Sequence, residues 1–161
     1  MLAAFVALVG CGAAFVWLTG QSLSGRVAVH FGASGMADGF MPRIVYLRGM
    51  LVFAAGLPLL LGLAMHHALG RPDVRIGLPR ADYWLAPQRR PATVRWLRRF
   101  FAAFESLLVV FLCYVHGLVV LANQVQPPQL AMPAFYGGLG VLAAALLVAT
   151  VVFVRYFRLG S

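Results

Sequence analysis

Few residues of this 161-residue chain could do chemistry, and four of them recur along one apolar stretch. Glu105 and His116 are eleven positions apart, which at about 100° per residue places them within about 20° of each other around a helix. Arg98 lies one heptad before Glu105, and Asn123 lies one heptad after His116. Ionisable groups inside a membrane are costly and often functional, yet polar side chains also hold helices together. The stripe of Arg98, Glu105, His116 and Asn123 is therefore open to both interpretations.

A metal site and an enzyme active site were the other chemistries to consider. His30 with Met36 and Met41 offers soft ligands that suit Cu(I), but no ligand pair has a diagnostic spacing, so these three are weak candidates only. The chain has no glycine-rich phosphate loop, no His-Glu-x-x-His helix and no nucleophile elbow. We therefore expect no enzyme activity, no bound metal and no cofactor.

The composition is that of a membrane protein. Hydrophobic residues make up 62% of the chain and charged residues 11%, whereas a soluble domain has about 25% charged residues. Four apolar runs are long enough to cross a bilayer, and lipid-exposed segments of this kind satisfy their backbone only as helices. The sequence predicts an all-α integral membrane protein, a single domain over 1–161, with spans at about 2–20, 46–69, 97–122 and 133–155. Pro58 predicts a kink in the second span, because proline removes a bond within the helix.

The arginines predict the orientation in the membrane. The chain has a formal net charge of +9 and contains thirteen arginines and no lysine. Ten of the thirteen lie between positions 70 and 99 or at the C-terminal end, and three lie near the loop after the first span. By the positive-inside rule, both termini and the basic loop 70–96 are cytoplasmic and the loop 21–45 faces outward.

Some of these arginines should contact lipid. A cation near an anionic membrane surface contributes about 1 kcal/mol of attraction, so we expect membrane lipids as partners and no nucleic acid. The predicted anionic-lipid contacts are Arg89, Arg90, Arg95, Arg99, Arg155 and Arg158.

The outward loop has strand and turn signals of its own. Arg26 to Phe31 alternates as a strand does, Gly32 to Gly35 reads as a turn, and Asp38-Gly39 predicts a second turn before Phe40. We therefore expect a small ordered structure after the first helix.

The same loop resembles the short signature of the SdpI-like family, bacterial multispanning membrane proteins whose best-known members protect a cell against its own secreted toxin peptide. The family's positions for a histidine-aromatic pair, a glycine, an aspartate, an aromatic and a basic residue are matched by His30, Phe31, Gly35, Asp38, Phe40 and Arg43. The chain departs from the pattern at Ser24, where proline is usual, and at Gly32, where a polar residue is common. It also has four predicted spans rather than a longer set.

The resemblance implies a non-enzymatic protein of the bacterial inner (plasma) membrane that binds a peptide or protein partner, of immunity or signalling type, through these six loop residues. Two alternatives remain. One is a small accessory subunit of a larger membrane complex, packed through small pairs such as Gly10 with Ala14 and Gly140 with Ala144. The other is an outward-facing His/Met metal-binding protein.

Overall fold

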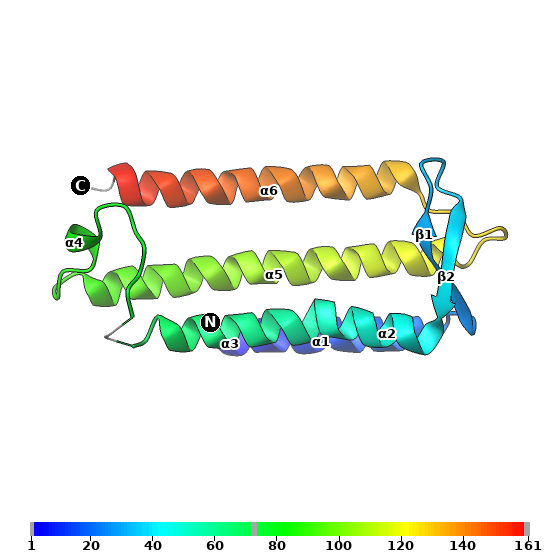
Figure 1. The fold of residues 1–161 in the computed structure, drawn as a ribbon, viewed down its shortest axis with the longest axis horizontal. Coiled ribbons are helices and arrows are strands. Elements are labelled where there is room, and N and C mark those ends of the chain that lie inside the picture. Colours follow the sequence, from blue (N-terminus) through cyan, green and yellow to red (C-terminus); the bar gives the residue numbers. More distant parts are fainter. Residues whose placement is uncertain (1, 72–73, 160–161) are drawn as a thin grey trace.

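Long helices run side by side along the molecule, and two strands lie across one end (Figure 1). The computed structural model describes residues 2–71 and 74–159. In chain order the elements are α1 (Leu2–Gly20), β1 (Arg26–Phe31), β2 (Ala37–Pro42), α2 (Arg43–Leu51), the π-helical η1 (Val52–Gly56), α3 (Leu57–Ala68), α4 (Ala81–Trp84), α5 (Arg90–Ala122) and α6 (Met132–Leu159). We call the end that carries β1 and β2 the hairpin end, and the opposite end, which carries α4, the arginine-rich end.

Four helical segments of the described chain are long and apolar enough to cross a membrane. They are Leu2–Gly20, Arg43–Ala68, Arg90–Ala122 and Met132–Arg158. The prediction of a mostly helical protein with four potential membrane helices is therefore confirmed. Helix α5 starts at Arg90 and α6 ends at Leu159, so both helices extend beyond the predicted spans.

The second of these segments is interrupted close to the predicted position. Elements α2, η1 and α3 follow one another directly, and Pro58 is the second residue after the π-helical η1. A proline cannot donate a backbone hydrogen bond, and π-helical turns are one way in which a helix absorbs such a gap. The local feature at Pro58 is thus a π-helical turn in place of a simple α-helical kink.

Three of the four segments form the packed part of the molecule. Helix α1 and the α2–η1–α3 segment both contact α5, and the buried core between them includes Phe5, Val16 and Val109. Gly12 permits the approach of α1 to α5, because a Cβ there would lie 3.1 Å from Cys113 Sγ. The small pairs of the sequence, Gly10 with Ala14 and Gly140 with Ala144, are exposed and make no such contact.

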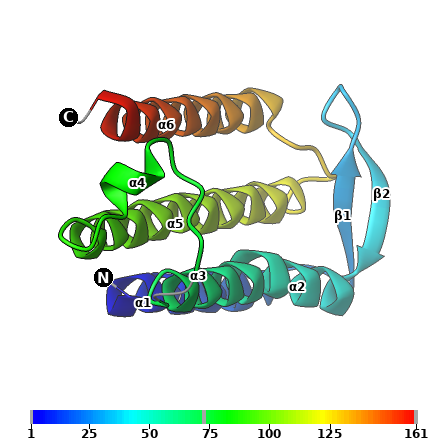
Figure 2. The ribbon, with the colours of Figure 1, turned by 60° about the vertical axis from the view of Figure 1, so that its left-hand side comes forward.

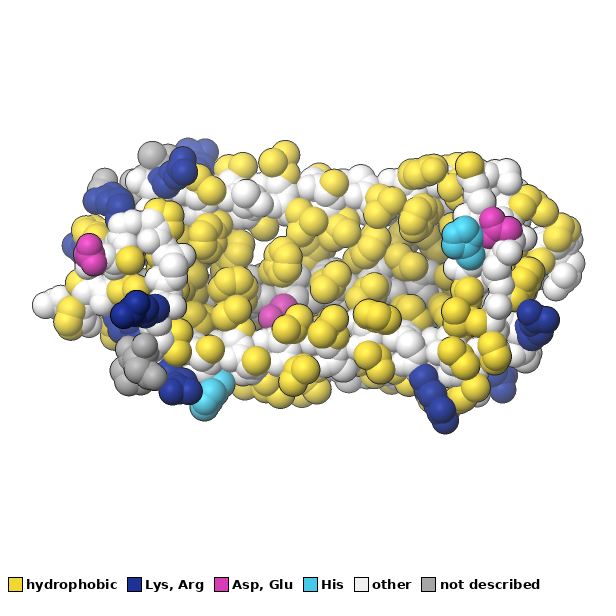
Figure 3. Space-filling model, viewed as in Figure 1, with side chains coloured by type: hydrophobic (Ala, Val, Ile, Leu, Met, Phe, Trp, Pro, Cys, Tyr) yellow, Lys and Arg dark blue, Asp and Glu magenta, His cyan; other side chains and the backbone are white. Residues whose placement is uncertain are grey.

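Helix α6 stands apart from this group and packs mainly against α5 (Figures 1 and 2). None of its most apolar 18-residue window is buried inside the molecule. An apolar groove between α5 and α6, lined by residues such as Val110, Tyr114 and Gly137, is visible as an opening in the surface (Figure 3). Helix α6 is therefore held by few contacts within this chain.

The contacts of α6 at the arginine-rich end are aromatic. Trp96 of α5 stacks on Tyr156 of α6, with ring centroids 4.2 Å apart. Trp84 of α4 also stacks on Tyr156, and its indole N–H donates to the Phe157 carbonyl at 3.1 Å. Figure 2 shows the segment after α3 crossing this end of the molecule to reach α4. The aromatic cluster thus ties the end of α6 to the start of α5.

The loop after α1 is a β-hairpin, so the prediction of an entirely α-helical protein needs one correction. Strands β1 and β2 pair antiparallel, with Arg26 opposite Pro42 and Ala28 opposite Phe40. The register shifts between Ala28 and His30, so Val29 bulges out of the ladder. The strand predicted over Arg26 to Phe31 is present, and the turn follows it.

The second turn predicted at Asp38-Gly39 is wrong, because both residues lie inside β2. Gly39 pairs with His30, and a Cβ at Gly39 would lie 2.8 Å from His30 Cβ. The glycine therefore serves the close approach of two strands beside a bulge, which is its other common use in sheets.

Arginine side chains gather at the two ends of the molecule and hydrophobic side chains cover the length between them (Figure 3). The arginine-rich end carries the arginines between positions 71 and 99 together with Arg155 and Arg158, and the hairpin end carries Arg26, Arg43 and Arg48. This banding is the pattern expected of a chain whose middle lies in hydrocarbon.

Candidate functional site

The most prominent polar group on the hairpin is a histidine paired with an acid. His30 Nδ1–H donates to Asp38 Oδ1, and the two side chains are 76% and 55% exposed. Phe40, two residues further along β2, is 46% exposed. Asp38 and Phe40 are both exposed and alternate with half-buried residues along β2. An ordered polar pair and an exposed aromatic ring thus lie close together on the surface.

A shallow depression adjoins this surface. Its volume is about 410 Å³, and Arg26 of β1, Phe40 of β2 and Gln126 of the α5–α6 connection line it. The depression brings a cation, an aromatic ring and an amide together from three parts of the chain. Peptide-binding surfaces commonly combine such groups, because an aromatic anchor supplies apolar contact and polar groups at its edge supply orientation.

Asn123 holds the hairpin to the top of α5. Its Oδ1 accepts a hydrogen bond from the Ala28 backbone N–H at 2.8 Å, and its Nδ2 donates to the Ala28 carbonyl at 3.0 Å and to the Val119 carbonyl at 2.9 Å. The side-chain amide therefore pairs with the edge of β1 as a neighbouring strand would. This position of the predicted polar stripe is structural.

The tip of the hairpin is held by the α5–α6 connection. The Leu130 N–H donates to the Gly35 carbonyl at 2.8 Å, and the Ala37 N–H donates to the Pro128 carbonyl at 3.2 Å. Gly35 has φ of +82°, and a Cβ there would lie 2.6 Å from the Leu130 carbonyl oxygen. Only glycine fits this turn, so Gly35 shapes the hairpin and offers no side chain to a partner.

Two further residues of the predicted partner surface also serve the fold. Arg43 donates from one guanidinium nitrogen to the carbonyls of Gln21 at 3.2 Å and Leu23 at 3.0 Å, which fixes the α1–β1 connection. Phe31 is half-buried against the core at this end of the molecule. Of the six residues that the resemblance pointed to, His30, Asp38 and Phe40 remain on the exposed surface.

His116 is completely buried, with 0% of its surface exposed. Its Nε2 lies 2.9 Å from Thr19 Oγ1, and its Nδ1 lies 2.9 Å from the Tyr46 hydroxyl. Thr19 donates its only hydroxyl proton to the Phe15 carbonyl at 2.6 Å, so Thr19 must accept from His116 Nε2–H. His116 Nδ1 then accepts from the Tyr46 hydroxyl. We call this chain of groups, from Tyr46 through His116 and Thr19 to the Phe15 carbonyl, the His116 network.

The His116 network satisfies a neutral imidazole completely. Tyr46 also stacks on the His116 ring, with centroids 5.7 Å apart, and Phe15 meets the ring edge-on at 5.8 Å. A protonated His116 would present N–H groups to both partners and leave the Tyr46 proton without an acceptor. The network therefore joins α1, α2 and α5 as a packing contact.

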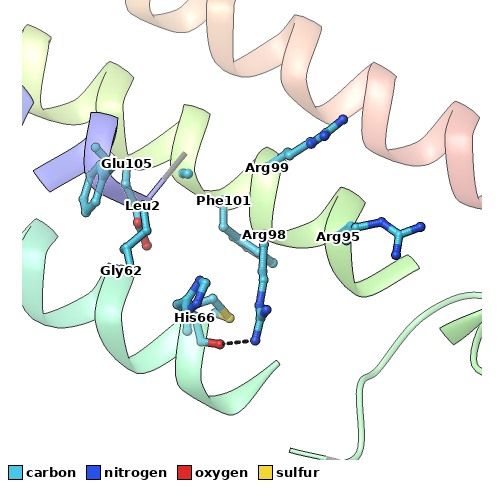
Figure 4. A pocket seen from close by; sticks show the side chains of 11 residues that line it. Leu2, Gly62, His66, Arg95, Arg98, Arg99, Phe101 and Glu105 are labelled. Atoms are coloured by element: carbon cyan, nitrogen blue, oxygen red, sulfur yellow. Dashed lines mark hydrogen bonds between the residues drawn. The ribbon is translucent and has the colours of Figure 1, made fainter. Parts of the chain in front are cut away.

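Arg98 and Glu105 lie toward the arginine-rich end of the same side of α5. Arg98 runs to α3, where its guanidinium donates to the His66 carbonyl at 2.8 Å (Figure 4). Glu105 faces α1 and α3, beside Phe5 and Gly62. Among the described residues Glu105 forms no ion pair and no hydrogen bond.

The predicted lipid-contacting arginines divide into two groups. Arg95, Arg99, Arg155 and Arg158 are exposed. Arg89 lies over the Tyr83 ring at 3.5 Å from its centroid, and Arg90 donates to the Arg71 carbonyl at 2.8 Å. The first group is available to lipid headgroups, whereas Arg89 and Arg90 also stabilise the 70–89 segment.

The weak metal-ligand candidates of the sequence lie in or beside the hairpin. Among residues 2–71 and 74–159, no three or more His, Cys, Asp or Glu side chains are grouped so as to hold a metal ion. His30 uses Nδ1 to bind Asp38, and Met36 lies in the turn that follows β1. Within the described residues, Asp38 is therefore the one acid beside His30, and no further His, Cys, Asp or Glu completes a set of three with them.

Sequence reasoning missed Thr19 and Tyr46, the partners of His116. One signal was available: Thr19 closes the first apolar run, and Tyr46 opens the second. Antiparallel neighbouring helices place those positions at one membrane depth, close to the depth of His116 in the third run. Comparing the membrane depths of polar residues would have predicted the contact of Thr19 and Tyr46 with His116.

Comparisons of the chain with protein-family models, with curated proteins and with solved structures gave no match.

Proposed function

We propose that this chain is a non-enzymatic protein of a bacterial inner membrane that binds a peptide or protein partner with the outer surface of its hairpin. The observation that carries the proposal is the exposed His30–Asp38 pair beside the exposed Phe40, on a hairpin held at its edge by Asn123 and at its tip by Leu130. A ligand surface is more selective when rigid elements position it, because less ordering is needed on binding.

The distribution of arginines supports an outward-facing surface. Ten arginines lie at or near the arginine-rich end and three at the hairpin end, and the positive-inside rule then favours a hairpin outside and both termini in the cytoplasm. An outward hairpin would meet secreted peptides or the outer parts of other membrane proteins. The resemblance of the hairpin sequence to the SdpI-like family points to an immunity or signalling role of this kind.

Native mass spectrometry tests the proposal. The chain is extracted gently from the membrane of its own cell, without overexpression, and its mass is measured for the wild type and for Asp38→Ala and Phe40→Ala. We expect a second component in the wild type, at least about tenfold depleted in both variants, since an anchor at the centre of an interface commonly contributes 2 kcal/mol or more. A component that both variants retain in full would contradict the proposal, as would a wild-type chain with no second component.

A second candidate function is supported by α6. Its apolar length is unburied and borders the apolar groove of about 450 Å³ against α5, as expected of a small accessory subunit whose partner supplies a helix. A Cβ at Gly137, which lines the groove, would meet nothing within 4 Å. Gly137→Leu should therefore fill the groove without a clash. Loss of the second component in this variant, with Asp38→Ala and Phe40→Ala unaffected, would favour the subunit over the hairpin receptor.

A further inference from the structure

A second potential site lies far from the hairpin, toward the arginine-rich end. A cavity of about 210 Å³ opens between α1, α3 and α5 (Figure 4). Its lining includes three arginines, Arg95, Arg98 and Arg99, together with apolar side chains such as Leu2, Phe5 and Phe101. The cavity thus combines cations with hydrocarbon.

Arg98 is the fixed cation of this cavity. One of its terminal nitrogens donates to the His66 carbonyl at 2.8 Å. Its Nε is buried and has no hydrogen-bond partner among the residues that the structure describes. A buried donor without an acceptor is destabilising, the more so on a charged group, and most buried polar groups in proteins are paired. Arg98 therefore lines the cavity and keeps one donor that no acceptor of the described chain satisfies.

Arg95 and Arg99 add charge at the same place. Arg95 is three residues before Arg98 and four before Arg99, whereas Arg98 and Arg99 are adjacent and leave α5 about 100° apart. Arg98 runs toward α3 in Figure 4, whereas Arg95 and Arg99 leave α5 in other directions and are exposed. No ion pair joins any of the three to an acid of the described chain. Long exposed arginine side chains can swing over a bound anion, which would also relieve their mutual repulsion.

Glu105 does not neutralise this cluster. It lines the same cavity seven residues beyond Arg98 along α5, a rise of about 10 Å. A Cβ at Gly62 would lie 2.6 Å from Glu105 Oε2, so the glycine leaves room for the carboxyl against α3. The single acid of the cavity is therefore offset from its arginines along α5.

We propose that this cavity binds a phosphate group, with Arg98 as the fixed donor and Arg95 and Arg99 as exposed donors that close over it. Arginine suits this ligand, because its fork of N–H groups matches the oxygens of a phosphate. The volume of about 210 Å³ corresponds to about seven waters at about 30 Å³ each. This space holds a phosphate headgroup but not the acyl chains of a phospholipid, which would remain in the surrounding lipid. A membrane phospholipid and free phosphate offer the same acceptor oxygens.

Lipid titration by native mass spectrometry tests the site. The full chain, in a zwitterionic detergent, is titrated with phosphatidylglycerol, with phosphatidylcholine of the same acyl chains, and separately with inorganic phosphate. Arg95→Gln with Arg99→Gln is compared with Arg155→Gln with Arg158→Gln, a pair that removes the same charge from exposed positions on α6. We expect one high-affinity phosphatidylglycerol, weakened at least tenfold by the first pair and less than threefold by the second. Equal weakening by both pairs would overturn the proposal, because it would indicate general surface electrostatics.

Further variants separate the ligand sources and the role of the acid. Arg98→Gln should abolish the high-affinity binding, and the Arg95–Arg99 pair gives the answer if Arg98→Gln fails to fold. Glu105→Gln should keep or strengthen binding, since it removes a negative charge from the same cavity, and a loss of binding would overturn the proposal. Arginine-dependent binding of phosphatidylglycerol identifies lipid as the source, and arginine-dependent binding of inorganic phosphate alone identifies free phosphate. Absence of both refutes the site.

Discussion

Tyr46→Phe removes one hydroxyl from the His116 network and nothing else. In the wild type the Tyr46 hydroxyl donates to His116 Nδ1 at 2.9 Å, while His116 donates through Nε2 to Thr19. Thr19 donates its only hydroxyl proton to the Phe15 carbonyl. His116 therefore cannot exchange its donor and acceptor nitrogens without losing its hydrogen bond to Thr19. The variant therefore leaves Nδ1 as an unpaired acceptor on a side chain that is fully buried.

The expected cost follows from that unpaired acceptor. Leaving a buried polar group unsatisfied costs about 1–3 kcal/mol, and hydrogen bonds between membrane helices contribute about 0.6 kcal/mol on average, with a maximum of about 1.7. We therefore expect Tyr46→Phe to lower the free energy of unfolding by about 1–2 kcal/mol. At about 2–4 °C per kcal/mol for a chain of this size, the unfolding midpoint should fall by about 2–8 °C.

Thermal unfolding of the purified chain in detergent, followed by tryptophan fluorescence at a fixed scan rate, measures the shift. Tyr136→Phe is the matched control, because Tyr136 is 60% exposed on α6 and should change stability by less than about 0.5 kcal/mol. In a His116→Phe background Tyr46→Phe should cost nothing, since the hydroxyl no longer has its partner. Equal midpoints for Tyr46→Phe and Tyr136→Phe would refute the assignment of His116 as a hydrogen-bonded packing group.

Three other outcomes are expected. Asn123→Ala should cost about 1–3 kcal/mol and speed hydrogen exchange at the Ala28 amide, because that N–H loses its acceptor; unchanged exchange would contradict the clamp. Trp96→Ala should destabilise the docking of α6 by about 2–3 kcal/mol, below the 3–5 typical of fully buried tryptophans, and lengthen a spin-label distance between α5 and α6. In a background without native cysteines, a membrane-impermeant maleimide should label Ser34→Cys in intact cells and Gln88→Cys only after permeabilisation, and the reverse pattern would invert the topology.

The helices were predictable because lipid leaves few choices. An apolar run of about 20 residues must be a helix in hydrocarbon, whatever its neighbours are, so composition alone indicated four of them. Their ends were less predictable. Helix α5 begins at Arg90, seven residues before the predicted span, because a helix can continue through the interface once its backbone bonds are made. The stretch from Arg90 to Trp96 has apolar side chains on one side only, so its composition does not indicate a membrane span. Packing of that side against α4 and α6 stabilises it as a helix.

The candidate site was harder to predict, because its geometry comes from tertiary contacts. Asp38-Gly39 carries a strong turn signal, but the bulge at Val29 and the approach of His30 make it part of a strand. Arg43 looked like a surface cation and instead binds two backbone carbonyls of the preceding connection. A sequence alone does not show which polar side chains will form hydrogen bonds with the protein's own backbone.

The distribution of satisfied polar groups separates the two ends of the molecule. At the hairpin end, Asn123 and His116 have partners for their polar atoms, and Arg43 binds two backbone carbonyls. That end is consequently a firm platform for the exposed residues Asp38 and Phe40. Toward the other end, Arg98 has a buried donor without a partner and Glu105 an unpaired carboxyl in the described chain. Since folded proteins rarely leave such groups unpaired, we propose a ligand at the arginine-rich end, whereas the proposed partner surface at the hairpin end needs no rearrangement to bind.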